Sequence, residues 1–428
     1  MDGKMEDMED AKMEDKEELG SPAREEDALS AEQKRALQAV LSGRNVFITG
    51  SAGTGKSYLI RLLVDKLRSI MGPEVAVTAS TGNAAHNLRL GARTPQSLFC
   101  FFDGCKNPPS PVWNAYKVLL IDECSMITRA DFETMNSLAQ TSRGSKLPFG
   151  GLQLILVGDF LQLPPVASPV VYIFETDLWK ELCFTTVMLT TPFRQPDPLF
   201  SSILNRIRVG AHSREDVQRL MANVPARSKV EPTHLFTQNK RVSEKNTCML
   251  TTLQGDTYRW DPDTTGVQGR PAPFDLARAK KDYVTLELRV GAQVMLTVNM
   301  SFEDGLVNGS RGVVLRIEDN APVVLFENGR AFKINAIKQV CQLANGSMTV
   351  VHVPLVLAWA MSIHKSQGQS LDSVFVSGRD AFAPGQIYVA LSRARSLKGL
   401  KAIELNNIKT CPKALEFYRQ LKGLPSVV

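Results

Sequence analysis

Cysteine and histidine are sparse in this chain of 428 residues, and their spacing excludes several kinds of site. The seven cysteines are scattered without a C-x-x-C pair, and the five histidines do not cluster with them. We therefore expect reduced thiols in an intracellular protein and no structural metal. No apolar run approaches the ~18 residues of a membrane span, so no membrane association is expected.

Residues 1–28 lack the features of a targeting signal and are strongly acidic. They contain no apolar core, and they are acidic where a mitochondrial presequence is rich in arginine, so the nucleus is the expected location. Their twelve Asp and Glu against four Lys and Arg predict a disordered acidic tail. The rest of the chain carries +14, although the whole carries +6. This basic remainder indicates either a polyanionic partner or a solvated basic surface.

One glycine-rich stretch predicts a nucleotide site. Residues 50–57 match the P-loop pattern G-x-x-x-x-G-K-[ST] without a mismatch. An apolar run over Asn45–Thr49 predicts a strand before the loop, and an amphipathic stretch over Ser57–Met71 predicts a helix after it. Such a turn places backbone N–H groups and the positive end of a helix around one anion. The expected phosphate-binding residues are Gly50, Ser51, Ala52, Gly53, Thr54, Gly55, Lys56 and Ser57. Lys56 would reach the β- and γ-phosphates, and the Ser57 hydroxyl would hold Mg²⁺.

The apolar pattern up to about Thr191 predicts a parallel sheet covered by helices on both faces. A first helix should begin at Ser30, which forms a capping box with Gln33, and end near Leu41. The expected strands are Val46–Thr49, Val75–Ala79, Val118–Asp122 and Leu154–Gly158. Active residues should then gather at the carboxyl ends of these strands. Aromatic residues and prolines interrupt the pattern over about 98–116, which indicates an insertion.

A second α/β region is expected from about Asp197, with helices at Leu199–Arg208 and Asn239–Leu253. Over 286–352, short apolar runs separated by Gly and Asn turns predict a small antiparallel barrel. The α/β pattern returns after this stretch. The expected organisation is therefore a tail over 1–28, a first domain over 29–195, and a second domain over 196–285 and 353–428 that contains the barrel.

Two of the predicted strands end in polar groups suited to phosphate chemistry. Asp122 and Glu123 end one strand, where Asp122 would bind Mg²⁺ through water and Glu123 would polarise the attacking water. Another strand leads into Gly-Asp-Phe-Leu-Gln-Leu-Pro-Pro over 158–165. The side-chain amide of Gln162 in this stretch could report whether the γ-phosphate is present.

The stretch over 158–165, preceded by Pro-Phe-Gly-Gly over 148–151, resembles the petite-integration-frequency family of superfamily I DNA helicases, most closely its eukaryotic members. Further motifs follow in the family's order, so the resemblance covers about residues 29–421. They are Thr78–Gly82, Phe193–Gln195, Val290–Leu296, Leu306–Gly312, Trp359–Gly368 and Tyr388–Arg395. The resemblance implies two RecA-like domains with ATP and Mg²⁺ in the cleft between them and single-stranded DNA across both.

The resemblance also implies roles in ATP hydrolysis. Gln162 would sense the γ-phosphate, and Arg194 and Arg393 would be arginine fingers from opposite sides of the cleft. Gln33 would hydrogen-bond the adenine edge. The capping box with Ser30 is the competing role for the Gln33 amide, and of the two we favour adenine.

The DNA contacts implied by the resemblance come from both domains. They are Thr81, Gln96, Ser97, His364, Lys365, Gln386 and Tyr388. Hydroxyl, amide and lysine groups suit phosphate contacts, which hold DNA without reading its sequence. Two features depart from the family: Gln96 stands where the family has histidine, and the aromatic insertion is shorter than the family's wedge region. In that insertion Phe99, Phe101 and Phe102 could stack on bases or fill a small core, and the sequence leaves both roles open.

The predicted function is thus that of an ATP-dependent DNA helicase acting as a monomer. The resemblance implies 5′-to-3′ translocation, unwinding of forked DNA, RNA–DNA hybrids and G-quadruplexes, and work in replication, repair, recombination and telomere maintenance, with the mitochondrion as a second location. One alternative is a translocase that displaces proteins without separating strands. Another is a nucleotide-switched DNA-binding module, against which Glu123 and the two arginines argue.

Overall fold

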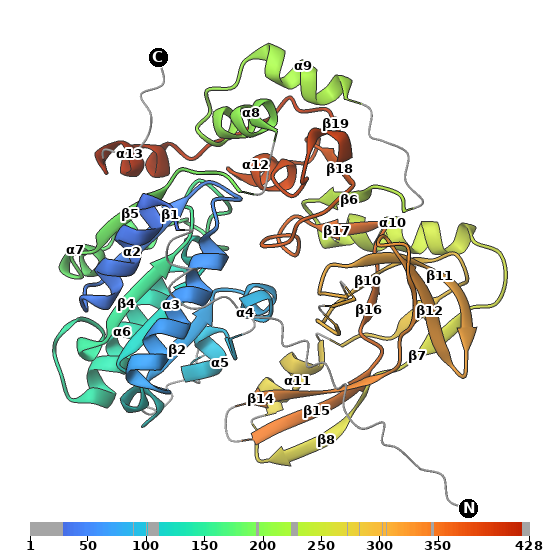
Figure 1. Cartoon of the computed structure of the whole chain (residues 1–428). Helices are drawn as coiled ribbons and strands as arrows, with labels where there is room; N and C mark the ends of the chain where they lie inside the picture. Colours follow the sequence, from blue (N-terminus) through green and yellow to red (C-terminus); the bar gives the residue numbers. More distant parts are fainter. Residues whose placement is uncertain are drawn as a thin grey trace, which may run out of the picture.

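The computed structural model describes most of the chain after residue 28. The described residues are 29–88, 90–99, 101, 111–193, 197–223, 230–271, 273–281, 283–301, 303–304, 306–343 and 346–421. The acidic tail predicted over 1–28 therefore lies outside the described part. Among the helices described, none combines the length and the apolar composition that crossing a membrane requires. Two parallel sheets and an antiparallel region make up the molecule (Figure 1).

The first α/β domain is built on a parallel sheet with the strand order β2-β3-β4-β1-β5. Its strands are β1 (Val46–Gly50), β2 (Val75–Ala79), β3 (Val118–Asp122), β4 (Gln153–Val157) and β5 (Thr185–Leu189). The four strands expected from the sequence are thus confirmed, and β5 adds an edge strand beside β1. Its helices are α2 (Ala31–Leu41), α3 (Lys56–Met71), α4 (Gly82–Leu88), α5 (Pro95–Phe99), α6 (Arg129–Arg143) and α7 (Asp177–Glu181). Short 3-10 helices are η1 (Pro111–Ala115), η2 (Cys124–Met126), η3 (Pro148–Gly151) and η4 (Ile173–Glu175).

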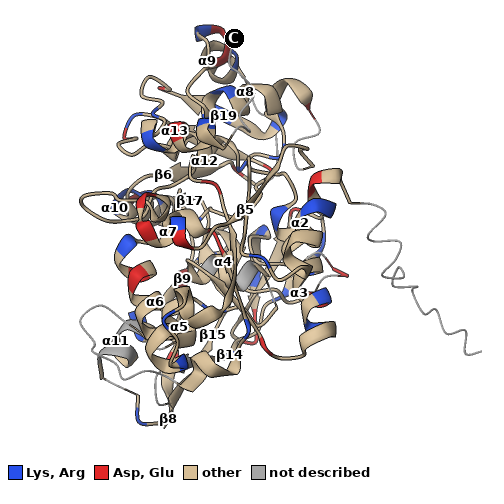
Figure 2. Cartoon of the chain, turned by 90° about the vertical axis from the view of Figure 1, so that its left-hand side faces the viewer, with Lys and Arg blue, Asp and Glu red and all other residues tan. Residues whose placement is uncertain are grey.

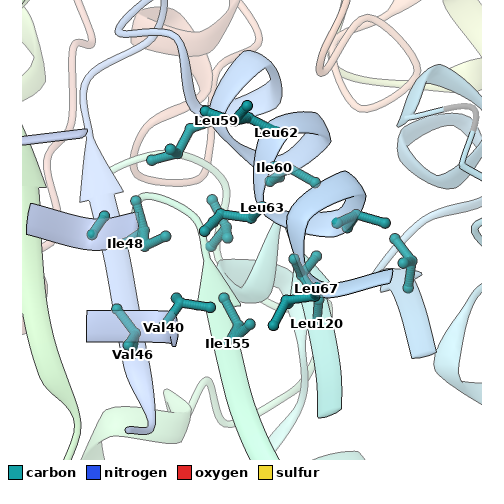
Figure 3. Close-up of a cluster of buried hydrophobic side chains, with 14 of the residues drawn as sticks. Val40, Val46, Ile48, Leu59, Ile60, Leu62, Leu63, Leu67, Leu120 and Ile155 are labelled. Atoms are coloured by element: carbon teal, nitrogen blue, oxygen red, sulfur yellow. The ribbon is translucent and has the colours of Figure 1, made fainter. Parts of the chain in front are cut away.

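Alternate residues of each strand face opposite sides of this sheet, because side chains alternate along a strand. Val46 and Ile48 pack with α2 and α3, whose apolar faces supply Val40, Leu59, Leu63 and Leu67 (Figure 3). Phe47 points to the other face, where its ring contacts Phe160 and Trp179 in a core cluster that also includes residues of α6. Both faces are therefore buried, which explains the continuous apolar runs that the sequence shows at these strands.

Helix α13 (Pro412–Gln420) completes the second of these faces. Although it follows the second sheet in the chain, its buried side chains Ala414 and Tyr418 belong to the core cluster around Phe47. Phe417 of the same helix stacks on Phe174 with ring centroids 4.3 Å apart. The first domain is thus assembled from two segments that are distant in sequence.

The second α/β domain has a four-stranded parallel sheet with the order β17-β6-β18-β19. The strands are β6 (Thr233–Phe236), β17 (Ala360–Ser362), β18 (Val374–Ser377) and β19 (Leu400–Ile403). The helices are α8 (Pro198–Arg208), α9 (Arg214–Ala222), α10 (Asn239–Thr252), α12 (Gln386–Leu391) and the 3-10 helix η5 (Leu397–Gly399). β6 and β17 are paired neighbours, although the antiparallel region lies between them in the chain.

The antiparallel region forms two main sheets rather than one. The larger has the order β13-β12-β11-β10-β16 and the smaller β14-β15-β8. Pairings among the described strands leave the larger sheet open, so a closed barrel is not confirmed. Two strands that precede residue 286, β7 and β8, pair with strands of this region. The elements are β7 (Tyr258–Trp260), β8 (Asp263–Gly269), α11 (Pro273–Lys281), β9 (Leu286–Leu288), β10 (Gln293–Leu296), β11 (Arg311–Glu318), β12 (Ala321–Phe326), β13 (Ala331–Lys333), β14 (Ile337–Leu343), β15 (Gly346–His352) and β16 (Leu355–Leu357).

Candidate nucleotide-binding site between the two α/β domains

The P-loop forms a tight turn between β1 and α3. A Cβ atom on Gly50 would lie 2.4 Å from the carbonyl oxygen of Leu189 in β5, so this position requires glycine. Gly55, with φ of +80°, precedes α3 in the left-handed conformation. The backbone N–H groups of residues 53–57 donate no hydrogen bond to another described residue. Together with the start of α3 they form a cradle that fits the phosphates of a nucleotide.

Lys56 is folded back over this loop. Its Nζ donates to the carbonyl oxygens of Gly50 at 2.8 Å and Ser51 at 2.9 Å. Burial lowers the pKa of Lys56, and the nearby carboxylates of Asp159 and Glu123 oppose that shift. The ammonium group is therefore held over the cradle by the loop itself, in a position suited to bind phosphate oxygens.

The acidic pair lies at the carboxyl end of β3. Burial, and then the charge of Glu123, raise the pKa of Asp122 to about 7, although the Glu123 N–H donates to its Oδ1 at 2.8 Å. A cation beside Asp122 would favour the charged carboxylate. Among the described residues no group of three or more His, Cys, Asp and Glu could hold a metal ion. Mg²⁺ commonly keeps waters and phosphate oxygens beside one or two protein ligands, so Asp122 and the Ser57 hydroxyl fit it.

Glu123 makes a hydrogen bond to the second domain. Its Oε2 accepts from Nε2 of Gln367, a residue of the loop after β17, at 3.0 Å. The other polar atom of this amide, Oε1 of Gln367, is buried and has no hydrogen-bond partner among the described residues. The carboxylate expected to polarise water therefore contacts both domains.

The loop over 158–165 is also held by both domains. Asp159 is fully buried and accepts two hydrogen bonds from Arg208 of α8, each 2.8 Å long. Burial opposes the charge of Asp159, but Arg208 keeps its pKa below the ordinary value. Gln162 is buried, and a Cβ on Gly385 would lie 2.2 Å from its carbonyl oxygen. The start of α12 is therefore packed directly against the predicted γ-phosphate sensor.

Of the two predicted arginine fingers, the structure describes one. Arg393 is buried, and its Nε donates to the Val389 carbonyl at 2.9 Å and its Nη2 to Ser392 Oγ at 2.8 Å. Nη1 lies 3.4 Å from two further backbone carbonyl oxygens of the same domain. Arg194 lies outside the described residues. Arg393 is thus held within the second domain in this conformation.

Gln33 forms the predicted capping box with one end of its amide and turns the other end towards the P-loop. Its Oε1 accepts from the Ser30 N–H at 3.0 Å, and its own N–H donates to Ser30 Oγ at 3.2 Å, which completes the capping box. Its Nε2 faces the P-loop, because a Cβ on Gly55 would lie 3.0 Å from it. The two roles use different atoms of the amide, so they do not exclude one another, and the adenine contact stays a prediction.

Two predicted DNA contacts are buried instead. Gln386 is 1% and Tyr388 3% exposed, and all six residues of α12 are buried, most of them in the core cluster of the second domain. The Tyr388 hydroxyl accepts from the N–H of Ala52 in the P-loop at 2.8 Å. Oε1 of Gln386 accepts from the backbone N–H groups of residues 382 and 383 at 3.0 and 3.1 Å. In this conformation Tyr388 contacts the first domain and Gln386 is bonded within the second, so neither side chain lies on an exposed DNA surface.

The remaining predicted DNA contacts lie in two places. In the first domain, Thr81 Oγ1 accepts from the Ala84 N–H at 3.2 Å, and Ser97 Oγ accepts from Arg93 at 3.0 Å. Gln96, which stands where the family has histidine, reaches Asp131 Oδ2 with its Nε2 at 3.4 Å. An amide in this position keeps a polar contact with α6 but lacks a titratable ring.

His364 and Lys365 follow β17 in the second domain. His364 is partly buried, and this burial lowers its pKa, so the ring is neutral near pH 7. The backbone N–H of Lys365 donates to Ser362 Oγ at 3.3 Å. Figure 2 shows Lys and Arg on helices of both domains, with Asp and Glu interspersed. The DNA roles of these residues stay predictions.

The aromatic residues of the short insertion fill a core. Phe99 is buried and stacks on Trp113, with ring centroids 3.6 Å apart and planes 7° apart. Phe101 is buried as well, and Phe102 lies outside the described residues. The described part of the insertion therefore offers no exposed phenylalanine for stacking on bases.

Four contacts at the site were not expected from the sequence. Gln367 lies inside a motif that carried the resemblance, so its importance could have been predicted. The motif did not reveal that its partner is Glu123. Tyr388 lies in another such motif, but was assigned to DNA. Arg208 and Tyr418, which both contact Asp159, lie outside those motifs. No local pattern marks them.

Comparisons with known proteins agree with this geometry. The family model for PIF1-like helicase matches residues 28–218, and that for DNA helicase Pif1, 2B domain, matches residues 284–317. The chain is 37% identical over 418 residues to the human ATP-dependent DNA helicase PIF1, covering 90% of this chain and 63% of that protein. It therefore spans less than two thirds of the human relative. The ATP-dependent DNA helicase Pif1 of Bdellovibrio bacteriovorus is 35% identical, covering 91% of both chains.

Solved structures show the same fold. The crystal structure of Pif1 helicase from Candida albicans aligns with a TM-score of 0.78 and 34% identity, over 92% of this chain and 99% of that chain. Bacteroides sp Pif1 in complex with ADP-AlF4 aligns with a TM-score of 0.73 and 30% identity, over 92% and 97%. Bacteroides Pif1 has also been solved bound to single-stranded DNA. The predicted α/β class with two RecA-like domains is confirmed, and the chain belongs to the PIF1-like helicase family.

Proposed function

We propose that this chain is an ATP-dependent DNA helicase that moves 5′ to 3′ along single-stranded DNA. One observation carries the proposal most directly. Residues of the second domain contact three predicted ATPase elements of the first: Gln367 binds Glu123, Tyr388 binds the P-loop, and Gly385 packs on Gln162. Binding or release of a nucleotide at this site would therefore change these three contacts between the domains.

The residues of the site divide the chemistry between them. The P-loop N–H groups and Lys56 would hold the phosphates, and Ser57 and Asp122 would hold Mg²⁺, which supplies charge neutralisation at the β- and γ-phosphates when bound. Glu123 would accept a proton from the attacking water. Arg393 and Arg194 are proposed to balance charge on the phosphoryl group.

The same contacts between the domains would couple ATP hydrolysis to movement on DNA. Bacteroides Pif1 binds single-stranded DNA, and a further structure concerns DNA unwinding at forked dsDNA by two coordinating Pif1 helicases. For this chain we propose single-stranded and forked DNA as partners. In each ATP cycle the two α/β domains would close on the nucleotide and open again. RNA–DNA hybrids and G-quadruplexes as substrates, a monomeric state and a nuclear location belong to the same proposal.

A second candidate is a translocase that displaces proteins without separating strands. The observation that favours it is the burial of Phe99 and Phe101, because a wedge that splits a duplex needs exposed apolar side chains.

ATPase and unwinding assays on the full chain test the proposal. We expect ATP hydrolysis to rise severalfold with single-stranded DNA, and a forked duplex with a 5′ tail to be unwound while one with only a 3′ tail is not. Lys56→Ala is the control and should abolish both activities, because it removes a cation beside the phosphates worth about 4 kcal/mol at an effective dielectric near 20. DNA-stimulated hydrolysis without unwinding of either substrate would support the translocase. Hydrolysis that ignores DNA would contradict both.

A further inference from the structure

Tyr418 of α13 is fully buried and reaches into the centre of the first domain. Its hydroxyl lies 2.6 Å from Thr49 Oγ1, 3.1 Å from the Phe160 nitrogen and 3.2 Å from Asp159 Oδ1. Thr49 immediately precedes the P-loop, whereas Asp159 and Phe160 begin the loop that carries Gln162. One hydroxyl therefore touches the residue that leads into the P-loop and the loop that carries Gln162, between which the γ-phosphate is expected.

The hydrogen bonds of this hydroxyl can be assigned completely. A phenol has one proton to donate and two acceptor positions. The Phe160 N–H can only donate and the ionised Asp159 can only accept, so Tyr418 donates to Asp159 and accepts from Phe160. The Thr49 hydroxyl then donates to the second acceptor position. Burial raises the pKa of Tyr418 well above its ordinary value, so the phenol keeps its proton.

The surroundings fix this arrangement from a second side. The Arg208 guanidinium lies over the Tyr418 ring, 5.3 Å from its centre, and binds Asp159 with two hydrogen bonds. The Gln162 N–H donates to the Asp159 carbonyl at 3.0 Å. A shift of the Tyr418 hydroxyl would thus pass to Gln162 through one residue, and to Gly50 through Thr49.

We propose that Tyr418 is a positioning residue that holds the Gln162 loop in register with the P-loop, so that the site distinguishes ATP from ADP. This inference rests on the proposed ATPase function. The rival role is mere stability, since Tyr418 also fills the core cluster around Phe47. In that case loss of the hydroxyl would lower the melting temperature and leave nucleotide discrimination unchanged.

Tyr418→Phe is the decisive variant because it removes the hydroxyl and keeps the ring. Tyr172→Phe is its matched control. Tyr172 is a buried tyrosine of the same core cluster, and its hydroxyl bonds to Cys411, the residue that precedes α13. The Tyr172 ring contacts Phe160, but Tyr172→Phe keeps that ring and removes only a buried hydroxyl beside the start of the same helix.

The measurement is the ratio of the dissociation constants for Mg-ADP and for a non-hydrolysable Mg-ATP analogue, with kcat, KM and the melting temperature beside it. For Tyr418→Phe we expect the analogue to lose roughly tenfold in affinity relative to ADP, and kcat to fall roughly tenfold, which is the effect of one buried hydrogen bond. Tyr172→Phe should stay within about twofold of the wild type in both. An unchanged ratio in Tyr418→Phe, or equal changes in both variants, would overturn the proposal.

Two further outcomes are covered by the design. If Tyr418→Phe does not fold, Thr49→Val removes one of the same hydrogen bonds with an isosteric side chain and should shift the same ratio in the same direction; no shift in that variant would overturn the proposal. If the wild type hydrolyses no ATP, the proposed function fails, while the binding ratio still decides the role of Tyr418.

Discussion

Glu123 is held in a backbone conformation that residues with side chains rarely adopt. Its φ is +52°, in the left-handed region, and Ser80 Oγ donates to its carbonyl oxygen at 2.8 Å. Such a conformation costs about 1–3 kcal/mol and persists only where the surroundings impose it. With Gln367 bound to its side chain, both the backbone and the carboxylate of Glu123 are positioned by contacts that the strand β3 alone does not provide.

The substitution Glu123→Gln should separate chemistry from binding. An amide has the same shape and still accepts a hydrogen bond from Gln367, but it cannot take the proton of the attacking water. We expect kcat to fall by roughly 10²–10⁴ while the affinity for ATP changes little. Steady-state ATPase and nucleotide-binding titrations check this. A matching loss of ATP affinity would indicate that Glu123 shapes the site rather than acting on water.

At the scale of elements, the strands of the first sheet were predictable because each is a continuous apolar run. Val75–Ala79 and Val118–Asp122 occur with the bounds expected, β1 is one residue longer at its end, and β4 is shifted by one residue. The P-loop and the end of β3 were equally predictable, since local spacing defines them. The antiparallel strands were expected in character, but their division into two sheets depends on pairings such as β8 with β15 that no local pattern specifies.

Contacts between distant segments account for most of what the sequence did not reveal. Tyr418 and Thr49 are 369 residues apart, and each looks ordinary in its own segment. Tyr388 was assigned to DNA because its motif fits, whereas its actual partner is a P-loop N–H group. A hydrogen bond of this kind depends on how two domains meet, which periodicity and composition do not encode.

The strand β6 should make the second domain sensitive to acid. Burial, together with the positive charges of Lys245 and Lys401, lowers the pKa of His234 to about 4, and its ring stacks on Phe375 at 4.2 Å. Below pH ~6.5 the His234 ring binds a proton in the unfolded chain but stays neutral in the folded chain. The free energy of unfolding therefore falls as the pH drops from 6.5 towards 4. Because the ring is partly exposed, we expect a loss of about 1–2 kcal/mol from this residue between pH 7 and 4.5.

His234→Phe keeps the stacking and removes the proton site. Denaturant unfolding of both proteins at pH 7 and pH 4.5 should therefore show a smaller loss of stability for the variant. Parallel losses in the two proteins would mean that His234 is not a source of the acid sensitivity.

At the scale of the whole molecule, the buried pair of Asp159 and Arg208 links the first domain to α8 of the second. Arg208→Met should cost about 3–5 kcal/mol, because it leaves a buried carboxylate without its cation. Adding Asp159→Asn to the same chain should recover part of that loss. Calorimetry should also show the domains unfolding in less closely coupled steps.

The matched control lies on the same helix. Arg206 pairs with Asp216, and 38% of the Arg206 side chain is exposed although only 7% of the Asp216 side chain is, so Arg206→Met should cost less, about 1–2 kcal/mol. Equal costs for the two arginines would show that the fully buried pair is no stronger a link than the partly exposed pair.

The placement of α13 has a consequence for how the protein is made. Phe417 contacts the rings of Phe47, Phe160 and Trp179, so one side of the first domain stays open until this helix arrives. A ribosome delivers the P-loop early and α13 only after the second sheet and the antiparallel region have emerged. Domains of most proteins fold as units in the order of their synthesis. Here the domain that is translated first is the one completed last, so newly made chains must keep an aromatic surface soluble while more than two hundred residues are added.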